Sequence, residues 1–320
     1  MPVNLDKPHL WKADIARSID FYNHWFINFA PSTFRESRLA TTRQVEYALH
    51  HTQAFSAITP QTLAAYPAVL QVLRMATAPP LARDRLAGLA GIKPTLIKNM
   101  EIYGRLPKRM PDAELDKSLA NVCALFDRLV DPDLFPWLAT KTRPSDEELH
   151  RVATVVADRL TGAVADPILR NAQEKRQLET LGVWLEQRGY TLAHPPSTAS
   201  LGDLPAGTYA IRFNVPIHQT GRQKSVNIPI DALIVSRQTP TSTLPLLIEA
   251  KSAGDFTNTN KRRKEEATKV NQLRATYGPD IRFALLLCGY FDTGYLGYEA
   301  AEGIDWIWEH RIEDLVHFGI

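Results

Sequence analysis

Two carboxylates and a lysine stand close together in two neighbouring apolar segments of the chain. Asp231 lies in the first segment, and the second segment ends in Glu249, Ala250 and Lys251. Alternate side chains of an extended strand share a face, so Glu249 and Lys251 are predicted to point the same way. Burying such charges is costly unless the carboxylates hold a metal ion and the lysine faces an anion or water.

Hydrolysis of a phosphodiester bond is a reaction that these residue types could perform. It needs a hard cation held by oxygen atoms, an activated water and a positive group near the developing negative charge. Asp231 and Glu249 could each offer a carboxylate oxygen to Mg²⁺, and the Ala250 carbonyl could be a third ligand. Lys251 could orient the water, or deprotonate it if burial or a cation lowered the lysine pKa. An ordinary strand pair with charged ends is the alternative interpretation.

The elements that must position these residues follow from the period of the apolar positions and from the helix and strand breakers. The pattern predicts a mixed β-sheet flanked by helices. In chain order it gives a helix at 166–188, strands at 208–215, 225–235 and 244–251, a helix at 261–277, strands at 281–288 and 305–308, and a helix at 312–318. The aromatic and glycine-rich stretch at 290–298 is expected to be a turn.

The first half of the chain has a different pattern. In residues 1–163, apolar residues recur at steps of three and four, and many prolines divide the segment into short helices. A separate capped helix is expected at 145–160. The whole chain is therefore predicted to be α+β, with an all-α domain at 1–163 and a sheet domain at 164–320.

Residues 84–100 resemble a helix-turn-helix. Gly91 falls where the turn belongs, and Thr95 and Lys98 lie on the second helix, where they could contact a DNA duplex. A plain αα-hairpin uses the same glycine for the same turn, so both interpretations stay open.

A polar and cationic segment directly follows the strand that carries Glu249. Cations placed there could bind phosphates beside a scissile bond, and asparagine or arginine could reach base edges. The candidate DNA-binding residues are Asn258, Asn260, Lys261, Arg262, Arg263 and Lys264. A solvated helix start is the alternative, although a cationic first turn opposes the helix dipole.

Composition excludes several classes of protein. The chain has 320 residues, 44% of them hydrophobic, and a net charge of only +2, so any nucleic-acid binding must come from local clusters. Two distant cysteines suggest reduced core residues. The absence of a signal peptide or an apolar span predicts a cytoplasmic protein that makes no membrane contact. No phosphate-binding loop or dinucleotide motif is present.

The Pro-x-Asp and Glu-x-Lys pattern on adjacent strands resembles the PD-(D/E)xK nuclease superfamily. Four segments are similar to the XamI-like type II restriction endonucleases. They are residues 170–178, 251–266, 288–298 and the Ile-Asp-Trp-Ile-Trp-Glu-His run at 304–310. The similarity is strongest from about residue 165 onward and looser in the first half of the chain.

This resemblance implies a fold, an activity and a set of partners. The expected protein is a Mg²⁺-dependent type II restriction endonuclease. It would hydrolyse both strands of DNA at a short palindromic site as a homodimer, beside a cognate DNA methyltransferase that acts on the same site. The resemblance also makes Glu174 a fourth active-site candidate, since this acid lies on the Leu178 and Leu181 stripe of its helix. A glutamate at the helix margin that reaches solvent is the alternative.

Two other functions remain open from the sequence. A nuclease with the same core could act in repair or on branched DNA, without sequence preference. A non-catalytic DNA-binding regulator could use the 84–100 hairpin and carry a decayed nuclease domain. The intact set of Asp231, Glu249 and Lys251 argues against the regulator.

Overall fold

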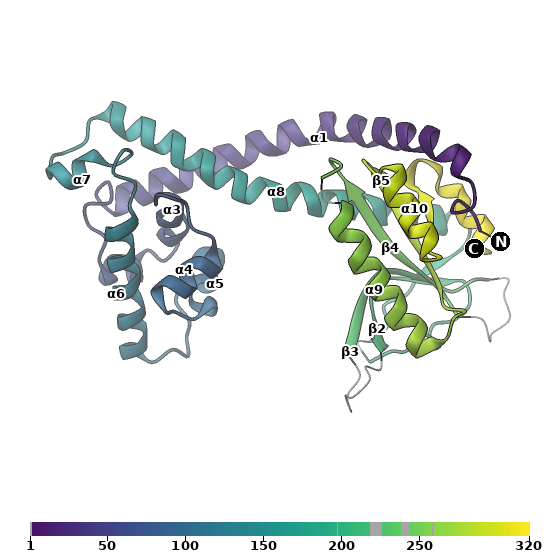
Figure 1. The fold of residues 1–320 in the computed structure, drawn as a ribbon. Coiled ribbons are helices and arrows are strands. Elements are labelled where there is room, and N and C mark those ends of the chain that lie inside the picture. The colour runs from purple at the N-terminus through teal and green to yellow at the C-terminus, as the bar shows by residue number, and fades with distance from the viewer. Residues whose placement is uncertain (1, 197, 218–225, 238–243, 258) are drawn as a thin grey trace. The chain divides into compact units, whose positions relative to one another are not determined.

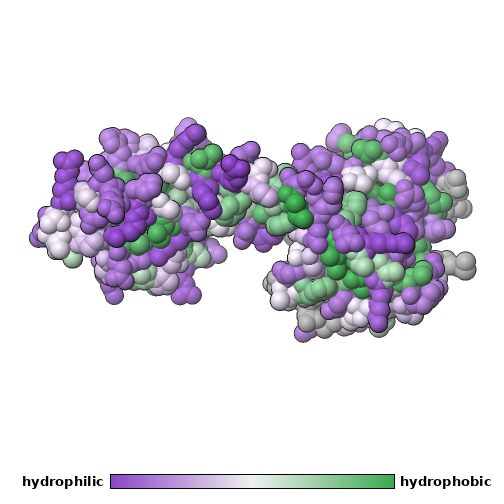
Figure 2. All heavy atoms as spheres, turned by 90° about the horizontal axis from the view of Figure 1, so that it is seen from above, coloured by the Kyte–Doolittle hydropathy of each residue, from purple (hydrophilic) through white to green (hydrophobic). Residues whose placement is uncertain are grey.

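The chain divides into two compact units, and the first of them is built from two separate stretches of sequence. A computed structural model describes residues 2–196, 198–217, 226–237, 244–257 and 259–320, with the side chains of 259–263 outside this description. Residues 1–29 and 170–320 form the sheet unit, and residues 30–169 form the helical unit. Figure 1 shows the elements of both. On the face seen in Figure 2, hydrophilic side chains cover most of each unit.

The elements follow one another in this order: α1 (Pro8–His51), α2 (Pro60–Ala65), α3 (Val69–Met75), α4 (Arg83–Ala90), α5 (Pro94–Tyr103), α6 (Asp112–Leu129), α7 (Pro136–Thr140), α8 (Asp146–Glu186), β1 (Thr191–Leu192), β2 (Thr208–Ile217), β3 (Val226–Ile234), β4 (Leu246–Ala253), α9 (Thr259–Tyr277), β5 (Arg282–Gly289), α10 (Thr293–Ala301), β6 (Asp305–Trp308) and the 3₁₀ helix η1 (Glu309–Phe318).

The sheet has six strands, and their order in space is their order in the chain, β1 to β6. Strand β3 is antiparallel to both of its neighbours, whereas β4, β5 and β6 run parallel. Parallel neighbours need crossover connections, and α9 and α10 provide them. The predicted α+β class, with a helical first half and a mixed sheet, is confirmed.

Each face of the sheet carries its own core. One core joins Leu247 of β4 and Leu285 of β5 to Val270 of α9 and Leu296 of α10. The other joins neighbouring strand positions to Leu181 and Leu185 of α8 and to residues of η1. Burial on both faces explains why β4 and β5 read as almost continuous apolar runs in the sequence.

The helical unit has a third core, which includes Leu86 of α4, Ile97 of α5 and Val122 of α6. Helix α4 ends at Gly91, whose φ of 63° is a left-handed cap that glycine adopts without strain. Pro94 then opens α5 at a position where a missing N–H costs nothing. The expected hairpin at 84–100 is therefore present as two helices with a tight turn.

The expected boundary between two helices near residue 163 is wrong. The helices expected at 145–160 and 166–188 are a single 41-residue helix, α8, with Pro167 inside it. Helix α1 likewise runs for 44 residues with Pro31 inside it. An internal proline removes one helical hydrogen bond and disfavours a helix, but packing on both sides of it can outweigh that cost.

The stretch expected to be a turn at 290–298 contains helix α10. Asp292 caps it, with its Oδ1 atom accepting a hydrogen bond from the backbone N–H of Tyr295 at 2.6 Å. Tyr295 and Leu296 are buried in the sheet unit. The glycines of this stretch suggested a turn, but the cap and the burial of these two side chains favour the helix.

Residues 1–29 lie with the sheet unit, whereas the sequence suggested one helical domain for all of 1–163. The backbone N–H groups of Val3 and Asn4 donate to the buried Asp305 carboxylate at 2.5 and 2.9 Å. Farther along α1, the Tyr22 hydroxyl accepts from the Gln173 side chain of α8 at 2.5 Å. These contacts are long-range, and a local pattern does not reveal them. Among the helices described, none is long and apolar enough to cross a membrane.

Candidate active site

Strand pairing brings the two predicted carboxylates together. Ala232 of β3 pairs with Ile248 of β4 in antiparallel register, and Asp231 and Glu249 are the next residues in that register. The Asp231 Oδ2 atom accepts a hydrogen bond from the Ala250 backbone N–H at 2.8 Å. The backbone that carries Glu249 therefore also fixes the position of the Asp231 carboxylate.

Glu249 is buried and holds the ammonium group of Lys251. The Lys251 Nζ atom lies 2.9 Å from the Glu249 Oε1 atom, so the two side chains share a face of β4 as predicted. Glu249 is only 6% exposed, and its Oε2 atom is buried with no hydrogen-bond partner among the described residues. One oxygen of this carboxylate is thus paired and the other is not.

Lys269 of α9 is a second cation on the same oxygen. Its Nζ atom lies 2.7 Å from Glu249 Oε1 and 3.0 Å from the carbonyl oxygen of Pro229, to which it donates. Lys269 was not among the residues predicted from the sequence.

Buried acids of α9 and α10 lie behind Lys251. Glu266 approaches the Lys251 ammonium to 3.9 Å and accepts a 2.6 Å hydrogen bond from the Tyr295 hydroxyl. Glu266 and Glu299 are both buried. Burial, more than any neighbour, raises the pKa of Glu266. The Lys251 ammonium therefore lies between Glu249 of β4 and Glu266 of α9.

These neighbours set the charge of the central groups. Burial, followed by the nearby Glu249 carboxylate, raises the pKa of Asp231 to about 6. Burial by itself lowers the pKa of Lys251, but the carboxylates of Glu249, Glu266 and Asp231 outweigh burial and hold that pKa above its usual value. Lys251 is an ammonium at neutral pH in this arrangement, so it can donate hydrogen bonds but cannot accept a proton from water.

Glu174 lies at the margin of the site rather than within it. Its carboxylate is 2.9 Å from the Arg212 guanidinium of β2, and its side chain is 37% exposed. Among the described residues it makes no hydrogen bond or ion pair with the three central side chains, although its charge contributes to the raised pKa of Asp231. This exposure agrees with the alternative of a glutamate at the helix margin that reaches solvent, and the Arg212 ion pair holds the carboxylate at the strand edge.

Arg212 has a left-handed backbone, with φ of 56°. Its position in β2 is opposite Asp231, between the pairs that Ile211 and Phe213 make with β3. A non-glycine residue in this conformation is strained, and such strain is concentrated at functional sites.

The donor set suits a hard divalent cation. It consists of two carboxylates and the Ala250 carbonyl, and one oxygen of Glu249 has no partner in the described part of the chain. In the part of the chain that the structure describes, no cluster of three or more His, Cys, Asp or Glu residues is arranged to hold a metal ion. Mg²⁺ commonly uses one or two carboxylates and takes water and phosphate oxygens for the rest, so this small set fits Mg²⁺.

The predicted DNA-binding residues are placed only in part. Asn258 and the side chains of Asn260, Lys261, Arg262 and Arg263 lie outside the described residues. Lys264 is exposed on α9. Thr95 and Lys98 are exposed on α5, in the helical unit.

The sequence did hold a signal for the residues that were missed. Glu266 stands four residues before Val270 and seven before Leu273, both of which are buried. A carboxylate on that stripe of α9 is as unusual as Glu174 on the stripe of α8. Lys269 follows Glu266 by three residues, which places both on one side of the helix.

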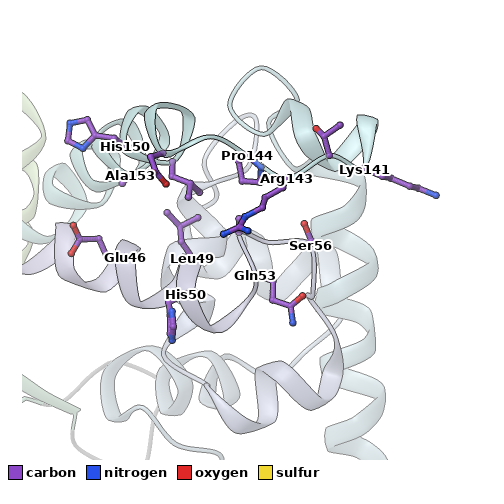
Figure 3. A pocket seen from close by; sticks show the side chains of 14 residues that line it. Glu46, Leu49, His50, Gln53, Ser56, Lys141, Arg143, Pro144, His150 and Ala153 are labelled. Atoms are coloured by element: carbon purple, nitrogen blue, oxygen red, sulfur yellow. The ribbon is translucent and has the colours of Figure 1, made fainter.

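A separate pocket lies within the helical unit, at the end of α1 and the start of α8 (Figure 3). Leu49, His50, Arg143 and His150 are among the residues that line it. The carboxylates described above do not contribute to this pocket.

Comparisons with known proteins identify what the chain is similar to. The family model described as XamI restriction endonuclease matches residues 53–308. The type II restriction enzyme SalI of Streptomyces albus G is 51% identical over 313 residues, which cover 98% of each chain. Among solved structures, protein VC1899 of Vibrio cholerae aligns with 13% identity and a TM-score of 0.29, over 91% of this chain and 56% of that one. At that score the structural likeness carries no argument.

Proposed function

This chain belongs to the XamI restriction endonuclease family of PD-(D/E)xK nucleases and cleaves DNA as a type II restriction endonuclease, and we propose that cleavage depends on Mg²⁺ held by Asp231, Glu249 and the Ala250 carbonyl. The reaction is the hydrolysis of a phosphodiester bond in each strand of a duplex, at a short palindromic site.

One observation is the main support for the metal assignment. Asp231 and Glu249 converge from adjacent strands, and the buried Oε2 atom of Glu249 has no hydrogen-bond partner among the described residues. A buried carboxylate oxygen without a partner is costly, and a bound cation would remove that cost.

The chemistry is divided between the cation and the side chains. When bound, Mg²⁺ would supply Lewis acidity and help to activate a water beside the scissile phosphate. The water oxygen attacks phosphorus and releases a proton to solvent, the bond from phosphorus to the leaving sugar oxygen breaks, and that oxygen takes up a proton from solvent. Lys251 remains an ammonium, orients the water and stabilises negative charge on the phosphate oxygens. Glu266 holds the Lys251 side chain in place.

Glu174 is proposed to act at the edge of the site through its charge. It contributes to the raised pKa of Asp231 and fixes Arg212 opposite that residue. Arg212 then presents a guanidinium where a DNA phosphate could be bound.

The proposed partners are duplex DNA, a second copy of the chain and a DNA methyltransferase that modifies the same site in the cytoplasm. Two identical active sites related by a twofold axis can cut two antiparallel strands of a palindrome. The basic residues 261–264 are proposed to bind phosphates, with Asn258 and Asn260 near base edges, and Thr95 and Lys98 to contact DNA from the helical unit. Run-off sequencing of a digested plasmid, together with the solution mass of the enzyme, tests the palindrome and the dimer.

The metal assignment is tested by Asp231→Ala. Cleavage is expected to fall by a factor on the order of a thousand or more, since the cation loses a ligand, while DNA binding in Ca²⁺ survives. Asp280→Ala removes an exposed carboxylate in the turn before β5 and is the matched control, with activity expected to stay at the wild-type level. Unchanged cutting by Asp231→Ala contradicts the assignment.

A further inference from the structure

Lys269 stands where it would oppose a divalent cation. Its ammonium group shares the Glu249 Oε1 atom with that of Lys251, at 2.7 and 2.9 Å. The contact with the Pro229 carbonyl at 3.0 Å ties it to β3 as well, and its side chain is only 19% exposed. This lysine is therefore fixed between the two strands that carry the carboxylates.

The two carboxylates proposed to hold the metal ion are already matched by two ammonium groups. Asp231 and Glu249 bring two negative charges, and Lys251 and Lys269 bring two positive ones. Both ammonium groups contact the Glu249 carboxylate directly. A divalent cation entering between these carboxylates would be repelled by two ammonium groups that already contact Glu249, which is unfavourable unless an anion enters with it.

We infer that Lys269 weakens cation binding in the DNA-free enzyme, so that the site fills only when a DNA phosphate supplies the balancing negative charge. The inference rests on the proposed function, because it takes Glu249 and Asp231 as the cation ligands. Lys269 is in this sense a positioning residue: it acts through Glu249 and through the order in which cation and DNA bind.

The direction of the effect separates this role from a structural one. Loss of a structural contact loosens the site and weakens cation binding. Loss of a repelling charge a few ångström from the cation strengthens binding, by about tenfold or more at the effective dielectric of a protein interior.

The test is the affinity of DNA-free enzyme for Mn²⁺, measured by titration calorimetry. Lys269→Met keeps the aliphatic stem and removes the charge, and we expect it to bind Mn²⁺ about tenfold more tightly than the wild type. Lys269→Gln, a shorter and polar replacement, is expected to show the same sign. Lys269→Arg keeps the charge and is expected to retain weak binding. An affinity that is unchanged or weaker in folded Lys269→Met and Lys269→Gln overturns the inference.

Two further variants complete the design. Lys175→Met removes an exposed lysine of α8 and changes the net charge equally, so its Mn²⁺ affinity is expected to match the wild type. Asp231→Ala is expected to abolish Mn²⁺ binding. If Asp231→Ala still binds Mn²⁺ normally, the metal assignment itself fails. If it loses Mn²⁺ and Lys269→Met shows no tightening, only the role of Lys269 is rejected. Thermal melting confirms that each variant is folded.

Discussion

At Asp231, the burial that suits a metal ligand also destabilises the metal-free fold. The pKa of this residue rises to about 6, whereas an unperturbed aspartate titrates near 4. The native state therefore binds more protons than the unfolded chain between about pH 4 and about pH 6, and the free energy of unfolding falls as the pH rises through that window. A difference of about two pKa units corresponds to about 3 kcal/mol.

Asp231→Asn removes this pH-dependent loss and keeps an oxygen that can accept the Ala250 hydrogen bond. In EDTA we expect the variant to melt at a higher temperature than the wild type above about pH 7, and at a similar temperature near about pH 4. Scanning calorimetry at both pH values measures this difference, with Asp280→Asn as an exposed control. A gain of equal size at both pH values would contradict the proposed cause.

The central residues of the site could be predicted because their spacing is local. Asp231, Glu249 and Lys251 lie on two consecutive strands, and strand alternation alone places Lys251 beside Glu249. Lys269 could not be placed in the same way, because its contact depends on how α9 packs against β4. The helical period places Glu174 on the same side of its helix as buried leucines. It does not show the ion pair with Arg212 of another strand, which holds the Glu174 carboxylate at the strand edge.

At the scale of elements, the end of β4 is held by two other segments. Gly289 ends β5 with φ of 101°, and a Cβ atom added there would lie 2.1 Å from the Ala253 carbonyl oxygen of β4. Its backbone N–H donates to the Ser18 hydroxyl of α1 at 2.8 Å. This close approach fixes Ala253, which stands two residues after Lys251.

Gly289→Ala should therefore move the end of β4 and impair the site. We expect a loss of at least about 2 kcal/mol in the stability of the sheet unit, from strain and from the clash with Ala253. Cleavage should fall as well. Gly202→Ala places its Cβ in open space and is the control, with stability and activity close to wild type. Urea unfolding measures the stability of both variants, and plasmid cleavage measures their activity. A stable, fully active Gly289→Ala would refute the prediction.

The strands were predictable to within a few residues, whereas helix lengths were not. Apolar runs with breakers on either side locate β2 to β5 well, because burial on both faces leaves a strong signal. Pro167 and the glycines near Tyr295 suggested breaks by their intrinsic preference. Packing of α8 and the Asp292 cap of α10 overrode that preference.

At the scale of the whole molecule, both units carry cations that are candidates for DNA contact. Lys98 is exposed on α5 of the helical unit, and Lys264 is exposed on α9 of the sheet unit. Each phosphate contact adds close to one unit to the slope of the logarithm of affinity against the logarithm of salt concentration.

If both units bind DNA, Lys98→Ala and Lys264→Ala should each weaken binding in Ca²⁺ and reduce the salt slope by about one. Lys117→Ala removes an exposed lysine of α6 with no proposed role and should leave the slope unchanged. Fluorescence anisotropy over a series of salt concentrations measures all three. A normal slope for Lys98→Ala would assign the 84–100 hairpin to a structural role.

The sheet unit is closed by two stretches of sequence that lie far apart, and this has a consequence for biosynthesis. Residues 30–169 leave the ribosome before the strands that carry the carboxylates have been made, so the helical unit can fold first. Residues 1–29 can join the sheet unit only after 170–320 have been synthesised, because the N–H groups of Val3 and Asn4 donate to Asp305. A nascent chain interrupted before residue 226 lacks both catalytic strands, and one interrupted before residue 305 lacks the carboxylate to which Val3 and Asn4 bind, so an unfinished polypeptide cannot complete the sheet unit.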